Sequence, residues 1–247
     1  MEGLSKKALQ IADLQQQILQ WQGFKQVSPK TRGLGLGELE QAFPGHVFPV
    51  GALHEFVCDN KEEEAASTGF IASLLSLLLQ KDGLALWISH SKELFAPAIS
   101  SFGLEPDRII FVQLQKQADR LWALEEGLKC EGIKVVLAEL PDINFVQSRR
   151  LQLLVEKSGV TGFLLRLQPS FLGATTCAAR WQIRSLPSRL PDEGLPGVGF
   201  PAWEVGLLKV KNGQPSSWQL SWQHGALQLL RKEQRTSPIS SHKRKAG

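Results

Sequence analysis

A polar turn between an apolar strand and a long apolar helix is the segment of this chain best suited to chemistry. In nucleotide hydrolases of this order the turn reads G-x-x-x-x-G-K-[ST], in which glycine amides and a lysine hold the phosphates. Here the turn covers Cys58–Gly69 and contains Lys61, Ser67 and Thr68, but three consecutive glutamates, Glu62–Glu64, stand among them. Carboxylates suit the positive end of a helix dipole and repel an anionic ligand there. The sequence therefore predicts a degenerate phosphate loop that binds no nucleotide cofactor.

Other ionisable residues fit structural roles better than catalytic ones. Glu125 and Glu126 are adjacent, and neighbouring helix residues point about 100° apart, which does not suit an acid–base pair. We expect them to be solvated or paired with Arg120 or Lys129. His54 lies in an apolar strand with no second histidine or cysteine close by, so it is expected in the core or at an edge rather than in a metal site.

Arginines at three positions suggest a basic surface. Arg149 and Arg150 are expected on a helix near the strand ends, and Arg166 follows on a strand. A solvated helix face explains these residues. Binding to an acidic partner surface or to a DNA backbone explains them as well, and the sequence leaves both interpretations open.

Length and charge limit the function classes. The chain has 247 residues, of which 43% are apolar, and a formal net charge of +4. This length fits one good-sized domain with appendages. Residues 231–247 carry a local charge of +5, so residues 1–230 carry a net charge of about −1. The body of the chain is therefore not a basic surface for nucleic acid. The tail is too polar to fold alone, so it is either a disordered end or a weak contact for DNA phosphates.

Targeting and redox signals point to the cytoplasm. No segment reaches the roughly 18 consecutive apolar residues that a membrane span requires, and the N-terminus lacks the apolar core of a signal peptide. Cys58, Cys130 and Cys177 are odd in number and widely spaced, so we expect reduced thiols rather than a disulfide or zinc framework. We expect a cytoplasmic protein without a membrane contact.

A helix is predicted from about Leu4 to Trp21, because Leu4, Ile11 and Ile18 fall near one helical face. The glycine- and proline-containing stretch Ser28–Gly37 is predicted as a linker. A helix on such a linker either folds back on its own core or docks on a neighbouring protein. The sequence does not separate these two alternatives.

Strands and helices alternate through the middle of the chain. We expect strands at Leu53–Val57, Leu84–Ser89, Arg108–Gln113, Val135–Leu140 and Gly162–Leu167, with helices near Ala65–Gln80, Lys92–Phe102, Lys116–Cys130 and Asn144–Lys157. Strands as continuously apolar as Ile133–Ala138 fit a parallel sheet covered on both faces. The alternation predicts an α/β fold, a three-layer αβα sandwich with right-handed crossovers.

Beyond Gln168 the pattern changes to strands without long helices. Ala178–Ser188, Trp203–Lys211 and Ser217–His224 are predicted strands, and Asn212-Gly213 predicts a hairpin between the last two. Trp218 and Trp222 share one face of the final strand. They are either core residues or an aromatic patch for a partner. The stretch Leu186–Pro201 is rich in proline and glycine and is predicted as a surface loop without regular structure.

Several separate sequence blocks occur along the chain in the same order as in a known protein family. They are Gly51–Phe56, Leu86–Ser89 with Leu94–Pro97, Gly103–Val112, Asp119–Glu126, Ser148–Arg166, Ala179–Trp181 and the hairpin with Trp218 and Trp222. Together they resemble the RecA recombinase core and, more closely, the ImuA family of RecA-like accessory proteins of bacterial error-prone repair. The likeness covers roughly Val50–Trp222, and its most specific block is Ser148–Arg166.

The resemblance implies where the RecA machinery would lie. The lysine and hydroxyl of the phosphate loop would fall near Ala66–Gly69, where the hydroxyls survive and no lysine does. The glutamate that activates water would follow the second strand, where the chain has Ser89–Ser91. The metal-associated acid maps to Glu139. Phosphoryl transfer needs a phosphate cradle, a metal and an oriented water together, so the resemblance implies a protein that is not an enzyme and has no metal site.

The resemblance also implies a role and partners. The role is that of a RecA-like adaptor in SOS-induced, mutagenic translesion DNA synthesis. The partners are an ImuB-like homologue of the Y-family polymerases and an error-prone replicative-type DNA polymerase, with RecA as a further candidate. Two alternatives are a cell-division inhibitor of the SulA type and an atypical NTPase that uses Lys61, Ser67 and Thr68.

The expected organisation is an N-terminal helix and linker at 1–37, a RecA-like core at 38–230 with a C-terminal antiparallel hairpin, and a basic disordered tail at 231–247. The candidate partner-binding residues lie in all three parts. They are Leu4, Ile11, Ile18, Arg149, Arg150, Trp218, Trp222, Lys243, Arg244 and Lys245.

Overall fold

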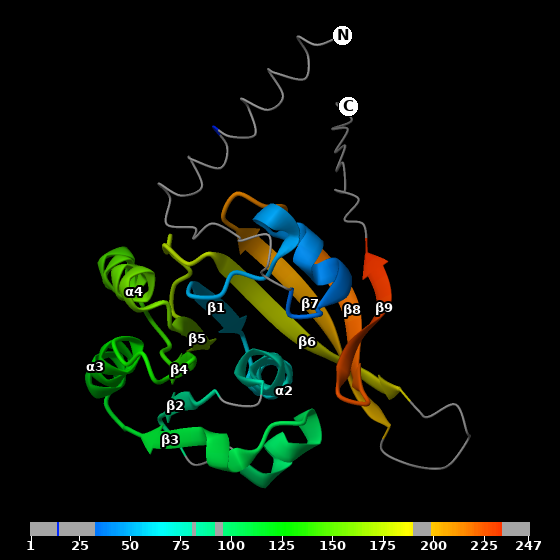
Figure 1. The fold of residues 1–247 in the computed structure, drawn as a ribbon, viewed down its shortest axis with the longest axis horizontal. Coiled ribbons are helices and arrows are strands. Elements are labelled where there is room, and N and C mark those ends of the chain that lie inside the picture. The colour runs from blue at the N-terminus through cyan, green and yellow to red at the C-terminus, as the bar shows by residue number, and fades with distance from the viewer. Residues whose placement is uncertain (1–13, 15–32, 81–82, 92–95, 190–198, 234–247) are drawn as a thin grey trace, which may run out of the picture.

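The computed structural model describes residues 14, 33–80, 83–91, 96–189 and 199–233. Within these residues one sheet has nine strands in the order β3-β2-β4-β5-β1-β6-β7-β8-β9. The strands are β1 Leu53–Cys58, β2 Ala85–Ser89, β3 Ile109–Gln113, β4 Val135–Glu139, β5 Thr161–Leu167, β6 Ala179–Arg189, β7 Phe200–Val210, β8 Ser216–Gln223 and β9 Ala226–Glu233. All pairings from β3 to β6 are parallel, and those from β6 to β9 are antiparallel (Figure 1).

Helices cover both faces of the parallel strands. The α-helices are α2 Lys61–Leu79, α3 Gln117–Leu128 and α4 Phe145–Ser158, and the short 3₁₀ helices are η1 Gly37–Ala42, η2 Pro44–His46, η3 Ala96–Phe102 and η4 Pro106–Arg108. One core cluster joins α2 and η1 to one face of the sheet, and a second joins α3 and α4 to the other face. The predicted three-layer α/β sandwich is confirmed (Figure 1).

The sequence explains why these helices form where they do. Asn144 caps α4, and the side chains of Asn144 and Gln147 each accept a hydrogen bond from the other's backbone amide. Gly159 ends α4 in the left-handed conformation, at φ 77°, which glycine adopts without steric cost. Helix α2 is held mainly by burial, because Phe70, Ile71 and their neighbours one turn on are fully buried against the sheet.

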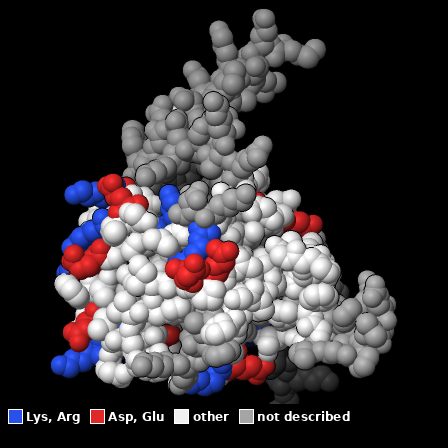
Figure 2. Space-filling view, turned by 60° about the horizontal axis from the view of Figure 1, so that its bottom comes forward, with Lys and Arg blue, Asp and Glu red and all other residues white. Residues whose placement is uncertain are grey.

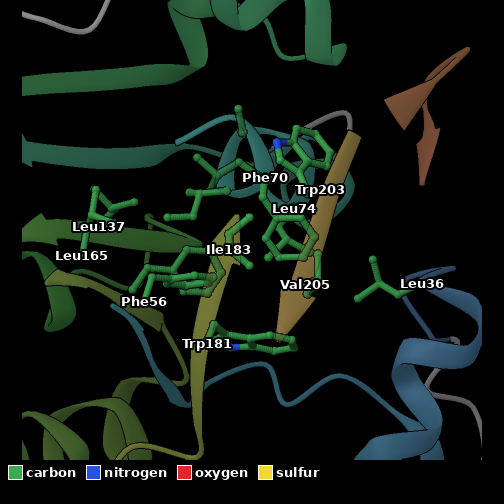
Figure 3. Close-up of a cluster of buried hydrophobic side chains, with 14 of the residues drawn as sticks. Leu36, Phe56, Phe70, Leu74, Leu137, Leu165, Trp181, Ile183, Trp203 and Val205 are labelled. Atoms are coloured by element: carbon green, nitrogen blue, oxygen red, sulfur yellow. The ribbon is translucent and has the colours of Figure 1, made fainter. Parts of the chain in front are cut away.

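An aromatic cluster lies between α2 and the middle of the sheet. Trp181 on β6 is 0% exposed and packs against Phe56 of β1 at a ring distance of 6.1 Å and against Phe70 of α2 at 6.2 Å. Trp203 on β7 meets Phe70 edge-on at 5.9 Å. Figure 3 shows both indoles directed toward the same apolar space as Leu74 of α2. This cluster joins the parallel half of the sheet to its antiparallel half.

The alternative of a partner-binding aromatic patch at Trp218 and Trp222 is wrong. Trp218 is 1% exposed and Trp222 is 4% exposed, and both belong to the core cluster beneath α2. The Trp222 indole donates to the Ser101 carbonyl oxygen at 3.3 Å. The hairpin is part of a continuous sheet, so the shared face of these tryptophans is covered by the helical layer rather than by a partner.

Several predicted boundaries also change. Helix α2 begins at Lys61, because Asn60 caps it, and not at Ala65. Strand β6 continues to Arg189 and β7 begins at Phe200, so the predicted loop is shorter. Strand β9 was not predicted, and it takes 231–233 of the supposed tail into the sheet. Leu36, in the predicted linker, is 4% exposed and packs in the core.

Some predictions lie outside the described residues. The helix Leu4–Trp21 with Leu4, Ile11 and Ile18 is among them, apart from residue 14, and so are Lys243, Arg244 and Lys245. Of the predicted helix Lys92–Phe102, the structure describes Ala96–Phe102, which forms a 3₁₀ helix. In the described part of the chain, none of the helices is long and apolar enough to cross a membrane.

Candidate functional site

The connection between β1 and α2 is where a nucleotide hydrolase of this fold would hold phosphate. Strand β1 ends at Cys58 and α2 begins at Lys61, so only Asp59 and Asn60 lie between them. The Asn60 side chain accepts a hydrogen bond from the Glu63 amide at 2.8 Å, and the Glu63 carboxylate accepts one from the Asp59 amide at 2.9 Å. Amides that would bind phosphate at a helix start are thus occupied by the chain's own side chains.

The residues of the degenerate phosphate loop do not come together. Ser67 is 0% exposed, and its hydroxyl oxygen accepts from the Cys58 thiol at 3.2 Å. Thr68 follows it inside α2, seven residues after Lys61, which is about 10 Å along a helix axis. Lys61 pairs instead with Glu64 at 3.1 Å. The two hydroxyls therefore lie within the helix, while the lysine stands at its first position.

A hollow of about 270 Å³ opens at the carboxyl ends of β2, β4 and β5, beside the start of α2. Ligands of open α/β sheets bind at this edge. The hollow is lined by Lys61, Glu64, His90, Arg120, Glu139, Pro141, Leu167 and Gln168. Pockets for small molecules span about 300–1,000 Å³, so this hollow lies just below the usual size.

The charged groups of the hollow are paired with one another or with the backbone. The Glu139 carboxylate accepts from the His90 amide at 2.9 Å and lies 3.1 Å from His90 Nδ1. Arg120 Nε donates to the Glu139 carbonyl oxygen at 2.7 Å, and its other donors bind the carbonyls of Leu114 and Gln115. Burial lowers the pKa of Arg120, and the nearby Glu139 opposes this shift. These hydrogen bonds hold the carboxyl ends of β2, β3 and β4 together.

The position that would hold a water-activating glutamate has a different role. The Ser89 hydroxyl donates to the Ser91 carbonyl oxygen at 2.9 Å, which closes a tight turn after β2. Its neighbour His90 is committed to Glu139. The structure thus places the predicted residues Ser89–Ser91 and Glu139 together, but as a hydrogen-bonded support.

A buried ion cluster on the α3–α4 face of the sheet was missed by the sequence analysis. Arg166 and Glu55 are both 0% exposed, and the Arg166 guanidinium pairs with the Glu55 carboxylate at 2.5 Å. Arg180 on the next strand pairs with the other carboxylate oxygen at 2.7 Å, and Thr175 donates to it at 3.1 Å. Arg166 is therefore no part of a basic surface. A lone glutamate inside an apolar strand was the available signal.

His54 is a core residue, as expected. It is 0% exposed and stacks on Phe48 at a ring distance of 4.5 Å. Its Nε2 lies 2.7 Å from the Pro49 carbonyl oxygen, and the Trp181 indole donates to Nδ1 at 3.4 Å. This pattern requires the neutral ring with its proton on Nε2. Desolvation lowers the pKa of His54 to about 4, although the bond to Pro49 opposes the shift.

Acidification should therefore destabilise the fold through His54. Between the ordinary value of 6.5 and the folded-state pKa of about 4, the unfolded chain binds a proton that the folded chain does not. The free energy of unfolding should fall by about 3 kcal/mol across this window as the pH decreases. Denaturant unfolding at several pH values from 7 to 4 measures this loss. In His54→Gln the loss should be smaller by that amount, and an unchanged pH profile would contradict the assignment.

The remaining candidates lie on the α3–α4 layer. Glu126 pairs with Lys129 at 2.6 Å, as expected, whereas Glu125 pairs with Arg150 of α4 rather than with Arg120. Arg149 and Arg150 are both exposed on α4. The cysteines Cys58, Cys130 and Cys177 are all free thiols, as predicted.

Comparison with known proteins places the chain in a family. No family model matches it. It is 31% identical over 207 residues to Protein ImuA of Caulobacter vibrioides (strain NA1000 / CB15N), an alignment that covers 78% of this chain and 84% of that protein. The chain belongs to the ImuA family.

Two further similarities are more distant. This ImuA homologue is 25% identical over 129 residues to Cell division inhibitor SulA of Yersinia pestis (strain Pestoides F), covering 52% of this chain and 76% of that one. The crystal structure of the RadB recombinase superposes with a TM-score of 0.54 at 11% identity, covering 80% of this chain and 98% of that one. The latter likeness establishes the RecA-like fold alone.

Proposed function

We propose that this ImuA homologue is a non-catalytic, RecA-like adaptor of SOS-induced translesion DNA synthesis that works through protein–protein contacts. The observation that carries the proposal is the start of α2, together with membership of the ImuA family. Asn60 and Glu63 occupy backbone amides there, and Lys61 is paired with Glu64. A phosphate group would have to displace these contacts and approach three consecutive glutamates.

The partners proposed for the adaptor are an ImuB-like homologue of the Y-family polymerases and an error-prone replicative-type DNA polymerase, with RecA as a further candidate. The physical reason is that a recombinase fold offers broad surfaces for other proteins. When its nucleotide site is closed, such contacts are no longer coupled to a hydrolysis cycle. Weak DNA contact through the basic tail is compatible with this role.

The test is retention of each purified partner by the tagged full chain. We expect the ImuB-like subunit to be retained, and deletion of 1–30 or of 234–247 to show which end contributes. The second deletion begins at 234 because β9 extends to Glu233 and must remain in the sheet. Calorimetric titration with ATP and magnesium should show no binding at micromolar concentrations. Micromolar affinity that Lys61→Ala abolishes would instead contradict the closed nucleotide site and favour the atypical NTPase.

A second candidate function rests on the similarity to Cell division inhibitor SulA, which extends over 129 residues. In that case the chain would block polymerisation of the bacterial tubulin homologue that drives cell division, and it would retain no polymerase subunit. A light-scattering assay of the polymerisation of that tubulin homologue, with the purified chain added, distinguishes the adaptor from the division inhibitor. We expect no inhibition at equimolar concentration, and inhibition without polymerase binding would favour the SulA-type role.

A further inference from the structure

The outward face of α4 has an unusual composition. Its exposed residues are all apolar or positively charged: Phe145, Val146, Arg149, Arg150, Leu153 and Lys157. Val146 is 75% exposed and Leu153 is 51% exposed. The opposite face of α4 is already buried against the sheet through Leu151 and Val155. A helix on a protein surface normally turns a polar face of mixed charge to solvent, so apolar residues on both faces indicate a contact site.

These residues form one stripe that continues onto α3. Val146, Arg150 and Leu153 are spaced i, i+4, i+7 and so share one side of α4. Arg150 pairs with Glu125 of α3, which joins the two helices at that level. Both helices return the chain from the carboxyl end of one parallel strand to the start of another, so they run in the same direction.

The exposed tryptophan of α3 lies at the level of this stripe. Val146 stands one turn before Arg150, and Trp122, which is 63% exposed, stands about one turn before Glu125. The two side chains therefore lie at the same height on neighbouring helices. We call the surface formed by Trp122, Val146, Arg149, Arg150 and Leu153 the α4 face. Along the margin where Figure 1 places these helices, Figure 2 shows both basic and acidic side chains.

The positive charge of the α4 face is only partly neutralised. Among the residues that the structure describes, no carboxylate lies within ion-pair distance of Arg149. The nearby Glu156 accepts a hydrogen bond from Gln152 at 3.1 Å. Burial lowers the pKa of Lys211, Glu156 opposes this, and Arg149 lowers it further. Two cations therefore repel one another at the edge of the face, and an acidic group placed there would be attracted.

We propose that the α4 face binds an acidic amphipathic helix of a partner protein. The apolar side of that helix covers Val146, Leu153 and Trp122, and its carboxylates pair with Arg149 and Arg150. Tryptophan and arginine are the residues that most often dominate binding energy at protein interfaces, and an apolar stripe flanked by charge is how helices are recognised in grooves. A nucleic acid would satisfy the arginines but leave the aliphatic side chains without a partner.

This inference rests on the proposed adaptor function and names its surface, but its test needs no polymerase. The probe is a synthetic peptide with leucine at i, i+3, i+4 and i+7 and glutamate at its other positions. A matched peptide has glutamine in place of glutamate. Chemical shifts of the isotope-labelled full chain should change on α3 and α4 when the acidic peptide is added. The glutamine peptide should bind about tenfold more weakly, and added salt should remove that difference.

Surface variants test whether the acidic peptide binds at the α4 face. Leu153→Ser and Arg149→Ser should each weaken the acidic peptide about tenfold. The matched controls are Leu229→Ser on β9, where the leucine is 41% exposed, and Lys134→Ser before β4, and both should bind as the wild type does. Melting temperatures verify that all four variants are folded.

Three results would overturn the proposal. They are no binding of the peptide, shift changes confined to other elements, and tighter binding of a thymidine oligonucleotide or of phosphatidylserine vesicles to the same face. Any of these three results, together with retention of the ImuB-like subunit by the full chain, would leave the adaptor function standing and this surface refuted. Failure of the unmutated full chain to retain the ImuB-like subunit would refute the adaptor function instead.

Discussion

Arg166→Leu should lower the free energy of unfolding by about 3–5 kcal/mol, because it leaves a buried carboxylate without its main partner. Arg166 and Glu55 are both 0% exposed, and Glu55 then keeps only Arg180 and Thr175. The carbonyl oxygens of Pro141 and Phe171, which accept from Arg166 at 2.7 and 3.0 Å, lose their donor as well. Chemical denaturation of the variant measures the loss.

A double-mutant cycle separates pairing from burial. Glu55→Leu combined with Arg166→Leu removes both charges, so it should be more stable than Arg166→Leu alone. Arg184→Leu is the control for an exposed arginine, since its side chain is 54% exposed and its buried partner Glu63 also accepts from the Asp59 amide. That change should cost less than about 1 kcal/mol. Equal costs for Arg166→Leu and Arg184→Leu would show that the buried pair contributes nothing special.

Trp181→Ala should lower the free energy of unfolding by about 3–5 kcal/mol, which is the range for removing a large aromatic side chain from a core. The Trp181 indole contacts rings from three separate parts of the chain, at Phe43, Phe56 and Phe70, and donates to His54. The resulting cavity would lie where β1, β6 and α2 meet. Phe43, which lies between η1 and η2, would lose its contact with the indole too. Denaturant unfolding, followed by tryptophan fluorescence and by circular dichroism, measures the cost.

Trp122→Ala is the matched control for this change. Its side chain is 63% exposed on α3, so its removal should change the free energy of unfolding by less than about 0.5 kcal/mol. The same variant should lower the affinity of the acidic peptide for the α4 face. If Trp122→Ala were as destabilising as Trp181→Ala, the exposed tryptophan would be a structural residue, and the α4 face would lose part of its support.

Under the proposed adaptor function, the stability of this RecA-like scaffold would not depend on a bound nucleotide. The strand ends that would hold phosphate and metal are joined by the contacts of Asn60, Glu63, Glu139 and Arg120. Such side chains replace, by internal hydrogen bonds, the contacts that a ligand would otherwise make. The scaffold can then present its outer surfaces in one fixed arrangement, which is what the adaptor proposal requires.

The parallel half of the fold could be predicted from the sequence because local signals were strong there. Continuous apolar strands such as β4 and amphipathic helices such as α4 each indicate their own structure and their burial on a sheet. The C-terminal half was less predictable. Strand β9 has three leucines, but Leu229 is 41% exposed, so its place in the sheet depends on pairing with β8 rather than on burial.

The candidate site was predicted in composition but not in geometry. The glutamates after β1 depart from the phosphate-loop pattern in sequence, but the early start of α2 depends on the Asn60 cap and on the fit of α2 against the sheet. In the same way, the outward direction of Val146 and Leu153 follows from which side of α4 is covered.

By itself, the amino-acid sequence determined the order of strands β1 to β8 and helices α2 to α4, and the family, because these depend on local periodicity and on blocks of residues. Only the tertiary structure decided that Trp218 and Arg166 are buried and that the α4 face is exposed. Burial is set by which elements lie across from a residue, and those elements come from distant parts of the chain.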